Sequence, residues 1–210
     1  MRTSTIEKQL FNDGFTHIAG IDEAGRGPLA GPVFAAAVIL PKNTSIRKLN
    51  DSKILTPSIR ESLYKTLLRN NISIGIGIAT PSEIDKLNIL NATFLAMKRA
   101  VGNLLVMPDY LLIDGNKTIP GINIKQKAIV KGDSKCVCIS AASIIAKVSR
   151  DKYMEEIHKK YSKYGFNQHK GYGTKEHFFA IKNFGICPEH RKTFLKKFVQ
   201  SDFQTSLFNL

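Results

Sequence analysis

The sequence predicts a single α/β domain. Short apolar segments typical of strands alternate with longer segments whose apolar residues recur at helical spacing. A chain of 210 residues is long enough to bury a full core without disulfides or metals. No internal repeat or low-complexity tract interrupts the alternation. This order of elements is typical of a sheet covered by helices.

The first two predicted strands flank a glycine-rich turn. They lie at 17–21 and 33–40, where apolar residues predominate. Residues 22–32 between them contain three glycines and two prolines, which favour a tight turn. The acidic pair Asp22 and Glu23 opens this turn, so we expect both carboxylates at the end of the first strand.

A polar loop at 41–53 leads to the first predicted helix. Thr56 is a suitable N-cap, and Pro57 suits the first helical position. The helix continues to about residue 70. Its apolar residues share one face because they recur every four positions, at Ile59, Leu63 and Leu67.

A strand and a second helix follow. Residues 72–79 alternate isoleucine with serine, glycine or alanine, which predicts a half-buried strand closely packed through its glycines. Thr80 and Glu83 have the spacing of a capping box, with Pro81 at the first helical position. Asn88 and Asn91 are expected to interrupt the helix. Its apolar face contains Leu87, Leu90, Phe94 and Met97.

The second half of the chain continues the alternation. Short strands are expected at 110–113 and 122–130, the first closed by Asp114 and the second leading to Asp133. A long helix is expected from 134 to about 162. A loop at 165–174 and two short helical pieces within 178–195, separated by Gly185 and Pro188, complete the prediction.

Charge indicates a polyanionic partner. The chain has 31 Lys and Arg against 17 Asp and Glu, a net charge of +14, and a pI near 9.7. Between residues 147 and 197 there are 13 basic and five acidic residues, so +8 of this charge lies in about a quarter of the chain. A uniformly basic surface, the alternative explanation, would not concentrate the charge in this way.

The sequence favours the cytoplasm. It has no run of 18 apolar residues, and its first residues lead into a polar segment rather than the core of a signal peptide. Three cysteines, an odd number, fit a reducing compartment. We expect no zinc site, because Cys136 and Cys138 do not form a Cys-x-x-Cys motif and Cys187 with His190 lacks a second histidine at ligand spacing.

The acidic pair is the strongest indication of function. Each carboxylate of Asp22 and Glu23 raises the cost of ionising the other, and a divalent cation relieves that cost. The glycines after the pair allow a ligand to approach the backbone, and Arg26 has the planar fork that suits phosphate. A metal, a phosphate-binding side chain and bare backbone together point to a phosphodiester substrate.

Six blocks of the sequence resemble ribonuclease HII, the type 2 ribonuclease H. The resemblance covers about residues 16–195 in the family's order. The blocks are Ala-Gly-Ile-Asp-Glu-Ala-Gly-Arg-Gly-Pro-Leu-Ala-Gly-Pro-Val at 19–33, Leu-Asn-Asp-Ser-Lys at 49–53, Leu-Ile-Asp-Gly at 112–115, Lys-Gly-Asp-Ser-Lys at 131–135, Ala-Ala-Ser-Ile-Ile-Ala-Lys at 141–147 and His-Lys-Gly-Tyr-Gly-Thr-Lys-Glu-His at 169–177.

This resemblance implies the fold and the reaction. The fold is ribonuclease H-like: a five-stranded mixed sheet flanked by helices over about 16–163, and a C-terminal helical, substrate-binding region over about 164–210. The expected activity is endonucleolytic hydrolysis of the RNA strand of RNA/DNA hybrids, and incision 5′ of ribonucleotides embedded in duplex DNA, giving 3′-hydroxyl and 5′-phosphate ends. The roles expected from this are in DNA replication and ribonucleotide excision repair.

Four acidic residues form the expected catalytic and metal-binding set. Asp22, Glu23, Asp114 and Asp133 each lie at the end of a predicted strand or the start of a helix, where side chains of separate elements converge. Taken singly, Asp114 is equally well read as a turn residue and Asp133 as an N-cap. The resemblance favours catalysis, because the family carries Asp-Glu-Asp-Asp at these positions. Two Mg²⁺ or Mn²⁺ ions are expected, about 4 Å apart on the scissile phosphate.

The remaining predicted site residues contact the substrate. Ser143 and Lys147 are four residues apart on one helix face, so they suit contacts to successive phosphates. For Ser143 alone, a role as a small packing residue is an equally good interpretation. The resemblance implies that a Gly-Arg-Gly backbone and a tyrosine read the ribose 2′-hydroxyl. The full expected set is Gly25, Arg26, Gly27, Asn50, Lys53, Ser143, Lys147 and Tyr172.

Alternative functions explain the sequence less well. Ribonuclease HIII differs in its glycine motif and adds an N-terminal domain, for which the roughly 16 residues before the first strand are too few. A non-catalytic nucleic-acid module does not explain four acidic residues, and a P-loop hydrolase lacks its motif. The histidines at 169, 177 and 190 are read as surface or phosphate-contacting groups.

Two features leave alternatives open. The residues after about Gln200, with Phe203 and Phe208, fit a terminal helix, a frayed tail or a peptide for a replication clamp. Nothing in the sequence requires a protein partner, so a monomer is expected.

Overall fold

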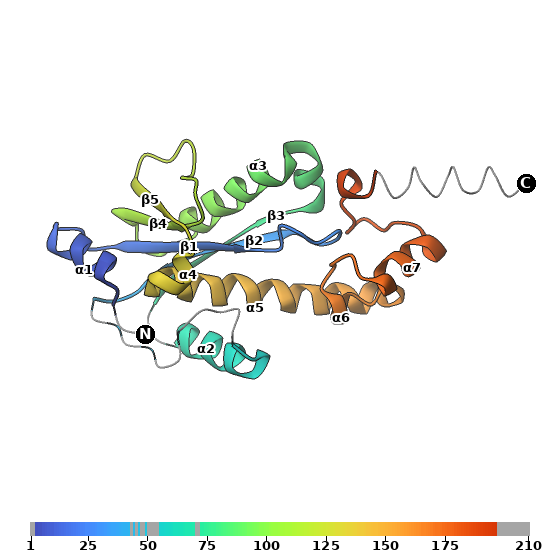
Figure 1. Cartoon of the computed structure of the whole chain (residues 1–210), viewed down its shortest axis with the longest axis horizontal. Coiled ribbons are helices and arrows are strands. Elements are labelled where there is room, and N and C mark those ends of the chain that lie inside the picture. The colour runs from blue at the N-terminus through green and yellow to red at the C-terminus, as the bar shows by residue number, and fades with distance from the viewer. Residues whose placement is uncertain are drawn as a thin grey trace, which may run out of the picture.

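A five-stranded mixed sheet forms the centre of the structure (Figure 1). The structure is a computed structural model, and it describes residues 3–42, 44, 46, 49, 55–69 and 72–196. The strand order is β3-β2-β1-β4-β5. The three strands β3, β2 and β1 are antiparallel neighbours, whereas β1, β4 and β5 are parallel. The strands are β1 Ile18–Ala24, β2 Val33–Ile39, β3 Ser73–Ala79, β4 Tyr110–Asp114 and β5 Lys125–Ile129. The predicted mixed five-stranded sheet is confirmed.

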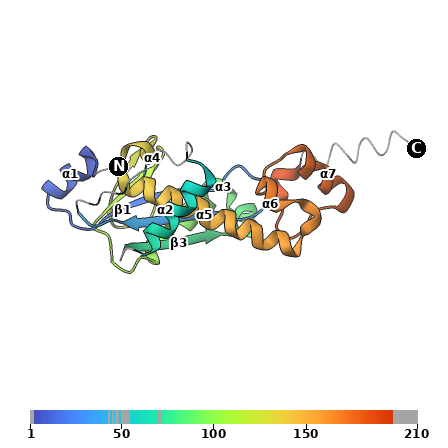
Figure 2. The same ribbon diagram turned by 90° about the horizontal axis from the view of Figure 1, so that it is seen from below.

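Helices cover both faces of this sheet. One face is covered by α3, and the other by α5 with α2 packed against its outer side (Figures 1 and 2). The helices are α1 Thr5–Asn12, α2 Pro57–Arg69, α3 Pro81–Gly102, α4 Gly132–Lys135, α5 Val137–Lys160, α6 Phe166–His169 and α7 Lys175–Phe184, with a short 3₁₀ helix η1 Ser162–Tyr164. No helix within the described residues is both long and apolar enough to cross a bilayer.

The first strand is longer than the sequence predicts. We expected it to end before the acidic pair, but β1 continues through Asp22 and Glu23 to Ala24. The reason is pairing: Asp22 and Glu23 lie opposite Ala36 and Ala35 of β2 in the antiparallel register. The carboxylates are therefore held on a rigid strand rather than on a turn. Conversely, β5 is shorter than the predicted 122–130, because its partner β4 has only five residues to pair with.

Glycines allow two helices to lie directly on the sheet. A Cβ at Gly20 of β1 would overlap the backbone of Cys138 in α5, and one at Gly77 of β3 would overlap the carbonyl oxygen of Ala96 in α3. The predicted close packing of the 72–79 strand is thus confirmed, with its glycine face buried and its isoleucine face only partly buried. Each face of the sheet has its own apolar core.

Two predicted helices are interrupted. Asn88 has a positive φ of 66° and kinks α3, and its side chain accepts hydrogen bonds from the amides of Leu90 and Asn91, so the predicted break is confirmed. The single helix expected from 134 to 162 is wrong. Cys136 adopts an extended conformation (φ −125°, ψ 131°) that separates α4 from α5.

The C-terminal region packs on the far half of α5. This helix has 24 residues, about 36 Å, and extends beyond the sheet to meet α6 and α7 (Figure 1). A third apolar cluster lies there, around Met154, Tyr164 and Phe166. The predicted loop at 165–174 is partly wrong because it contains α6. The two predicted helical pieces on either side of Gly185 and Pro188 are confirmed as α7 and a helical turn at 192–196.

The first helix, α1, was not predicted. It begins with a capping box in which Ser4 and Glu7 bond each other's backbone amides, a pattern readable in the sequence. Glu7 is buried and also accepts hydrogen bonds from the amides of Val137 and Cys138 at 3.2 and 2.9 Å. A residue near the N-terminus therefore caps α5, the helix that carries Ser143 and Lys147.

Candidate active site

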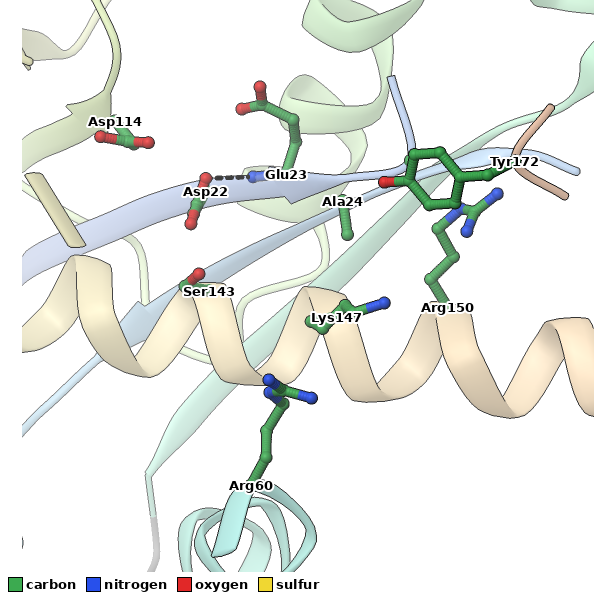
Figure 3. A pocket seen from close by; sticks show the side chains of 10 residues that line it. Asp22, Glu23, Ala24, Arg60, Asp114, Ser143, Lys147, Arg150 and Tyr172 are labelled. Carbon is green, nitrogen blue, oxygen red and sulfur yellow. Dashed lines mark hydrogen bonds between the residues drawn. The ribbon is translucent and has the colours of Figure 1, made fainter. Parts of the chain in front are cut away.

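A cavity of about 450 Å³ opens where β1 and β4 end beside α5. Side chains from the sheet, from α2, from α5 and from the C-terminal region converge on it (Figure 3). Its lining consists of Asp22, Glu23, Ala24, Gly25, Arg60, Asp114, Ser143, Lys147, Arg150 and Tyr172. Seven of the predicted site residues are in this set, although they are spread over 150 positions of the sequence.

Three of the four predicted acidic residues meet at the ends of neighbouring strands. Ile21 of β1 pairs with Ile113 of β4, so the next residues, Asp22 and Asp114, lie side by side on the two strands. Successive side chains of a strand point to opposite faces. Asp22 therefore points toward α5 and Glu23 away from it, as Figure 3 shows.

Burial makes this group of carboxylates costly to ionise. Burial, followed by the charge of Glu23, raises the pKa of Asp22 well above its usual value, and the charge of Asp114 adds to the effect. Burial also raises the pKa of Glu23. The positive charge of Arg26, whose Nη1 lies 3.2 Å from Glu23 Oε1, opposes this rise. A bound cation would remove most of this cost.

Asp133 lies close to this group but does not line the cavity. The amide of the preceding residue, Gly132, donates to Asp114 Oδ1 at 2.7 Å, so α4 begins against Asp114. Asp133 itself is buried, and its Oδ1 accepts a hydrogen bond from the amide of Ser134 at 3.0 Å. The structure thus brings together Asp22, Glu23 and Asp114 and leaves Asp133 one residue away from a contact with Asp114.

The carboxylates suit a hard cation held by few protein ligands. Within the described parts of the chain, no three acidic, cysteine or histidine side chains form a metal cage by themselves. Mg²⁺ is commonly bound by one or two carboxylates, with waters and substrate phosphates completing its shell. The oxygen donors of Asp22, Glu23 and Asp114 at the wall of an open cavity fit that mode of binding.

The predicted phosphate contacts lie on α5 beneath the carboxylates. Ser143 and Lys147 line the cavity one helical turn apart (Figure 3). A hydrogen bond from the Ser143 side chain lowers the pKa of Asp22, against the larger effect of burial, and Lys147 Nζ lies 2.7 Å from Asp151 Oδ1. Two further predicted contacts, Asn50 and Lys53, lie outside the described residues, as does the tail after about residue 200.

Sequence reasoning missed Arg60, which enters the same cavity from α2 and whose Nη2 donates to the carbonyl oxygen of Leu55. Nothing in its position along the helix distinguishes it from other surface arginines. Only the packing of α2 against α5 brings its guanidinium toward Lys147 (Figure 3).

The glycine motif and Tyr172 are neighbours. A Cβ on Gly27 would lie 3.7 Å from Cε1 of the Tyr172 ring, which is 48% exposed and faces the cavity. The two loops are also joined through their backbones, because the amide of Leu29 donates to the carbonyl oxygen of Gly171 at 2.8 Å. Of the predicted ribose-reading elements, Gly25 and Tyr172 line the cavity, whereas Arg26 and Gly27 lie beside them without lining it.

The interpretation of the histidines as surface groups is wrong for two of them. His177 is fully buried and His190 is 2% exposed, and their Nε2 atoms are 3.1 Å apart. Burial lowers the pKa of each to about 4, so both are neutral at pH 7. The ring of His169 stacks on that of His177. This cluster fills the C-terminal region behind Tyr172, whose carbonyl oxygen lies 2.8 Å from His177 Nδ1.

A mixed sheet in this strand order, with acidic residues on neighbouring strands, places the protein in the class of ribonuclease H-like folds. The solved structure of ribonuclease H2 from Pyrococcus horikoshii OT3 superposes with a TM-score of 0.70 and 28% identity, over 84% of this chain and 92% of that one. The similarity thus covers both the sheet and its covering helices.

Sequence comparison narrows the class to one family. The family model of ribonuclease HII matches residues 19–206. Ribonuclease HII of Acetivibrio thermocellus is 58% identical over 193 residues, 92% of this chain and 75% of that protein. Ribonuclease HII of Clostridioides difficile is 53% identical over 191 residues, 91% and 74% of the two chains. The chain belongs to the ribonuclease HII family and is a metal-dependent endonuclease that acts on the RNA of RNA/DNA hybrids.

Proposed function

We propose that this enzyme also incises duplex DNA on the 5′ side of a single embedded ribonucleotide. The observation that carries the proposal is the shared cavity: Gly25 of the glycine motif and Tyr172 line it together with Asp22 and Glu23. Groups suited to reading a ribose and groups suited to serving a scissile phosphate then face the same cavity. One 2′-hydroxyl is enough for such a site, so a continuous RNA strand is not required.

The 2′-hydroxyl is what distinguishes the target nucleotide from deoxyribose. It both donates and accepts hydrogen bonds. The backbone at Gly25 and Gly27 has no side chain to block its approach, and the Tyr172 ring offers a stacking surface with a hydroxyl. Recognition through backbone and ring is independent of the base, which suits an enzyme that must act at any sequence.

Two divalent ions, Mg²⁺ or Mn²⁺, are proposed as cofactors. Asp22, Glu23, Asp114 and Asp133 would hold them, Asp133 after a small rearrangement of α4 toward the cavity. When bound, such ions activate water and stabilise the leaving oxygen. In-line attack at the phosphate, with the 3′ oxygen leaving, yields 3′-hydroxyl and 5′-phosphate ends.

The duplex is proposed to lie across α5 toward the basic C-terminal region. Ser143 and Lys147 are suited to phosphates next to the scissile one, with Asn50 and Lys53 as proposed additional contacts. Phosphate contacts of this kind position the duplex without reading its sequence. We propose a cytoplasmic role in ribonucleotide excision and replication, which fits the free thiols of Cys136, Cys138 and Cys187.

The test is cleavage of an end-labelled DNA duplex that bears one ribonucleotide, with an all-DNA duplex as matched control. In Mg²⁺ or Mn²⁺ we expect one cut 5′ of the ribonucleotide, and none in EDTA or in the control. A phosphatase step and ligation of the products identify the ends. Cleavage of a continuous hybrid but not of this duplex would contradict the proposal.

A further inference from the structure

The loop at 25–32 is held from behind by a buried arginine of the C-terminal region. Arg191 is fully buried, and its guanidinium donates to three backbone carbonyl oxygens. Its Nη2 lies 2.6 Å from the oxygen of Gly25, its Nη1 2.9 Å from that of Arg26 and its Nε 2.9 Å from that of Gly31. One side chain thus sets the orientation of three peptide groups.

A second buried arginine joins this loop to the loop that carries Tyr172. Arg150 of α5 is 1% exposed. It donates to the carbonyl oxygens of Pro32 at 3.0 Å and Ala30 at 3.1 Å, and its Nη1 donates to that of Lys170 at 3.0 Å. Two of its hydrogen bonds therefore hold the glycine-rich loop, and the third holds the loop that leads into Tyr172.

Two glycines of the loop leave the space that the Arg150 side chain occupies. Gly25 has a φ of +94°, and a Cβ there would overlap the Arg150 side chain. Gly31 has a φ of +82°, and a Cβ there would lie 3.3 Å from Arg150 Nη2 and closer still to Met154. A side chain at either position would disfavour the left-handed backbone. It would also occupy space that the Arg150 side chain fills. The arrangement of Arg150 therefore depends on glycine at both positions.

Two adjacent buried cations are an expensive way to brace a loop. Burial lowers the pKa of Arg150, and burial followed by the charge of Arg150 lowers the pKa of Arg191 to about 9. Arg191 therefore remains charged at pH 7, and a guanidinium such as that of Arg150 does not lose its proton in proteins. A loop that needed only stability would be filled more cheaply by apolar side chains, whereas aiming carbonyl and amide groups needs fixed donors in a rigid fork.

We propose that Arg150 and Arg191 are positioning residues that lock the glycine motif and the Tyr172 loop into one unit, so that both meet the same nucleotide. The hydrogen bonds of Arg191 fix the carbonyl groups of Gly25 and Arg26, and Gly25 lines the cavity. This inference rests on the proposed reading of an embedded ribonucleotide. It adds that the reading is cooperative and depends on residues that do not touch the substrate.

The test is a double-mutant cycle between Arg191→Lys and Tyr172→Ala on the single-ribonucleotide duplex. Lysine keeps the charge but has a single ammonium, which does not hold three carbonyl groups in a plane. We expect kcat to fall about tenfold for Arg191→Lys, with KM changed less than about threefold, because most phosphate contacts remain. In the Tyr172→Ala background the same substitution should cost less than about threefold, since parts of one unit are not additive.

A destabilised fold is distinguished from lost positioning by a matched variant. Met97→Ala removes a buried side chain of α3, the helix that covers the other face of the sheet from α5, and should also lower Tm. It should leave kcat and the Tyr172→Ala effect unchanged below its Tm. If Arg191→Lys does not fold, Arg150→Lys gives the same cycle. Hydrogen exchange at the Leu29, Ala30 and Gly31 amides should accelerate in either arginine variant and not in Met97→Ala.

Two outcomes overturn the inference. One is an Arg191→Lys loss that multiplies fully with that of Tyr172→Ala, and the other is unchanged kcat and amide exchange in both arginine variants. Failure of the proposed function is seen separately, because the wild-type enzyme would then leave the single-ribonucleotide duplex uncut while cleaving a continuous hybrid.

Discussion

Replacing Tyr172 by alanine tests how the enzyme recognises its target nucleotide. The ring is 48% exposed and rests beside Gly27 at the cavity wall, so its loss leaves no hole in the core. Stacking of a nucleotide on an aromatic ring contributes about 1–3 kcal/mol. If this contact is strongest in the transition state, Tyr172→Ala lowers kcat/KM about tenfold to a hundredfold, since about 1.4 kcal/mol corresponds to a factor of ten.

The assay compares two substrates and two control variants. Initial rates are measured on a duplex with one ribonucleotide and on a continuous RNA/DNA hybrid, and the loss should be larger on the first. Tyr172→Phe keeps the ring and should stay within about threefold if stacking dominates. Phe179→Ala removes another exposed aromatic ring, 69% exposed on α7, which does not line the cavity, and should change neither rate.

Equal losses on both substrates for Tyr172→Ala would refute this reasoning. The ring would then only shape its loop, and recognition of a junction would have to come from other groups. A large loss in Tyr172→Phe, with the ring retained, would instead assign recognition to the hydroxyl.

Three further predictions concern the metal site, a helix cap and the buried histidines. Asp114→Asn keeps an oxygen that can accept the Gly132 amide, so the local fold should be preserved, but it removes the negative charge that a metal ion needs. Cleavage in saturating Mg²⁺ should therefore be abolished, while hybrid affinity measured by fluorescence anisotropy stays within a few-fold. Near-normal turnover would exclude Asp114 as a ligand. Glu7→Gln replaces a buried acceptor of amides at the start of α5 and should cost about 2–4 kcal/mol, lowering Tm by roughly 5–15 °C; an unchanged Tm in calorimetry would contradict this cap. Burial lowers the pKa of His177 and His190 from 6.5 in the unfolded chain to about 4, so the folded state binds fewer protons than the unfolded state. The free energy of unfolding is therefore full above pH 6.5 and falls as the pH drops toward 4, by up to about 3 kcal/mol for each histidine. The stability advantage of the wild type over His177→Asn in urea should therefore shrink between pH 7.5 and 5, and a constant difference would refute the linkage.

Several elements were predictable because their signals are local. The capping box at Thr80, the break at Asn88 and the glycine spacing of β3 each act within one turn or one strand, and the structure has them where the sequence predicts them. The capping box of Ser4 and Glu7 at the start of α1 is an equally local signal. In contrast, the extent of β1 and the break at Cys136 depend on partners in other elements.

The candidate site shows the same division. Asp22 and Glu23 could be predicted as functional residues from the sequence, because an adjacent acidic pair before a glycine-rich turn is costly to ionise without a cation. Arg191 and Arg150 carry no such signal. Each resembles any surface arginine in the sequence, and its role comes from carbonyl groups as far as 166 positions away.

Residue type and short-range spacing were enough to predict the family, the α/β class, the acidic residues and the basic charge. Which of those residues meet depends on long-range packing, which is visible only in the three-dimensional structure. Parallel pairing of β1 with β4 sets Asp22 beside Asp114, while Asp133 stays within α4. Likewise, only the packing of the C-terminal region on α5 buries His177, His190 and both arginines. These contacts join residues that are far apart in the sequence, so the spacing of neighbouring residues does not predict them.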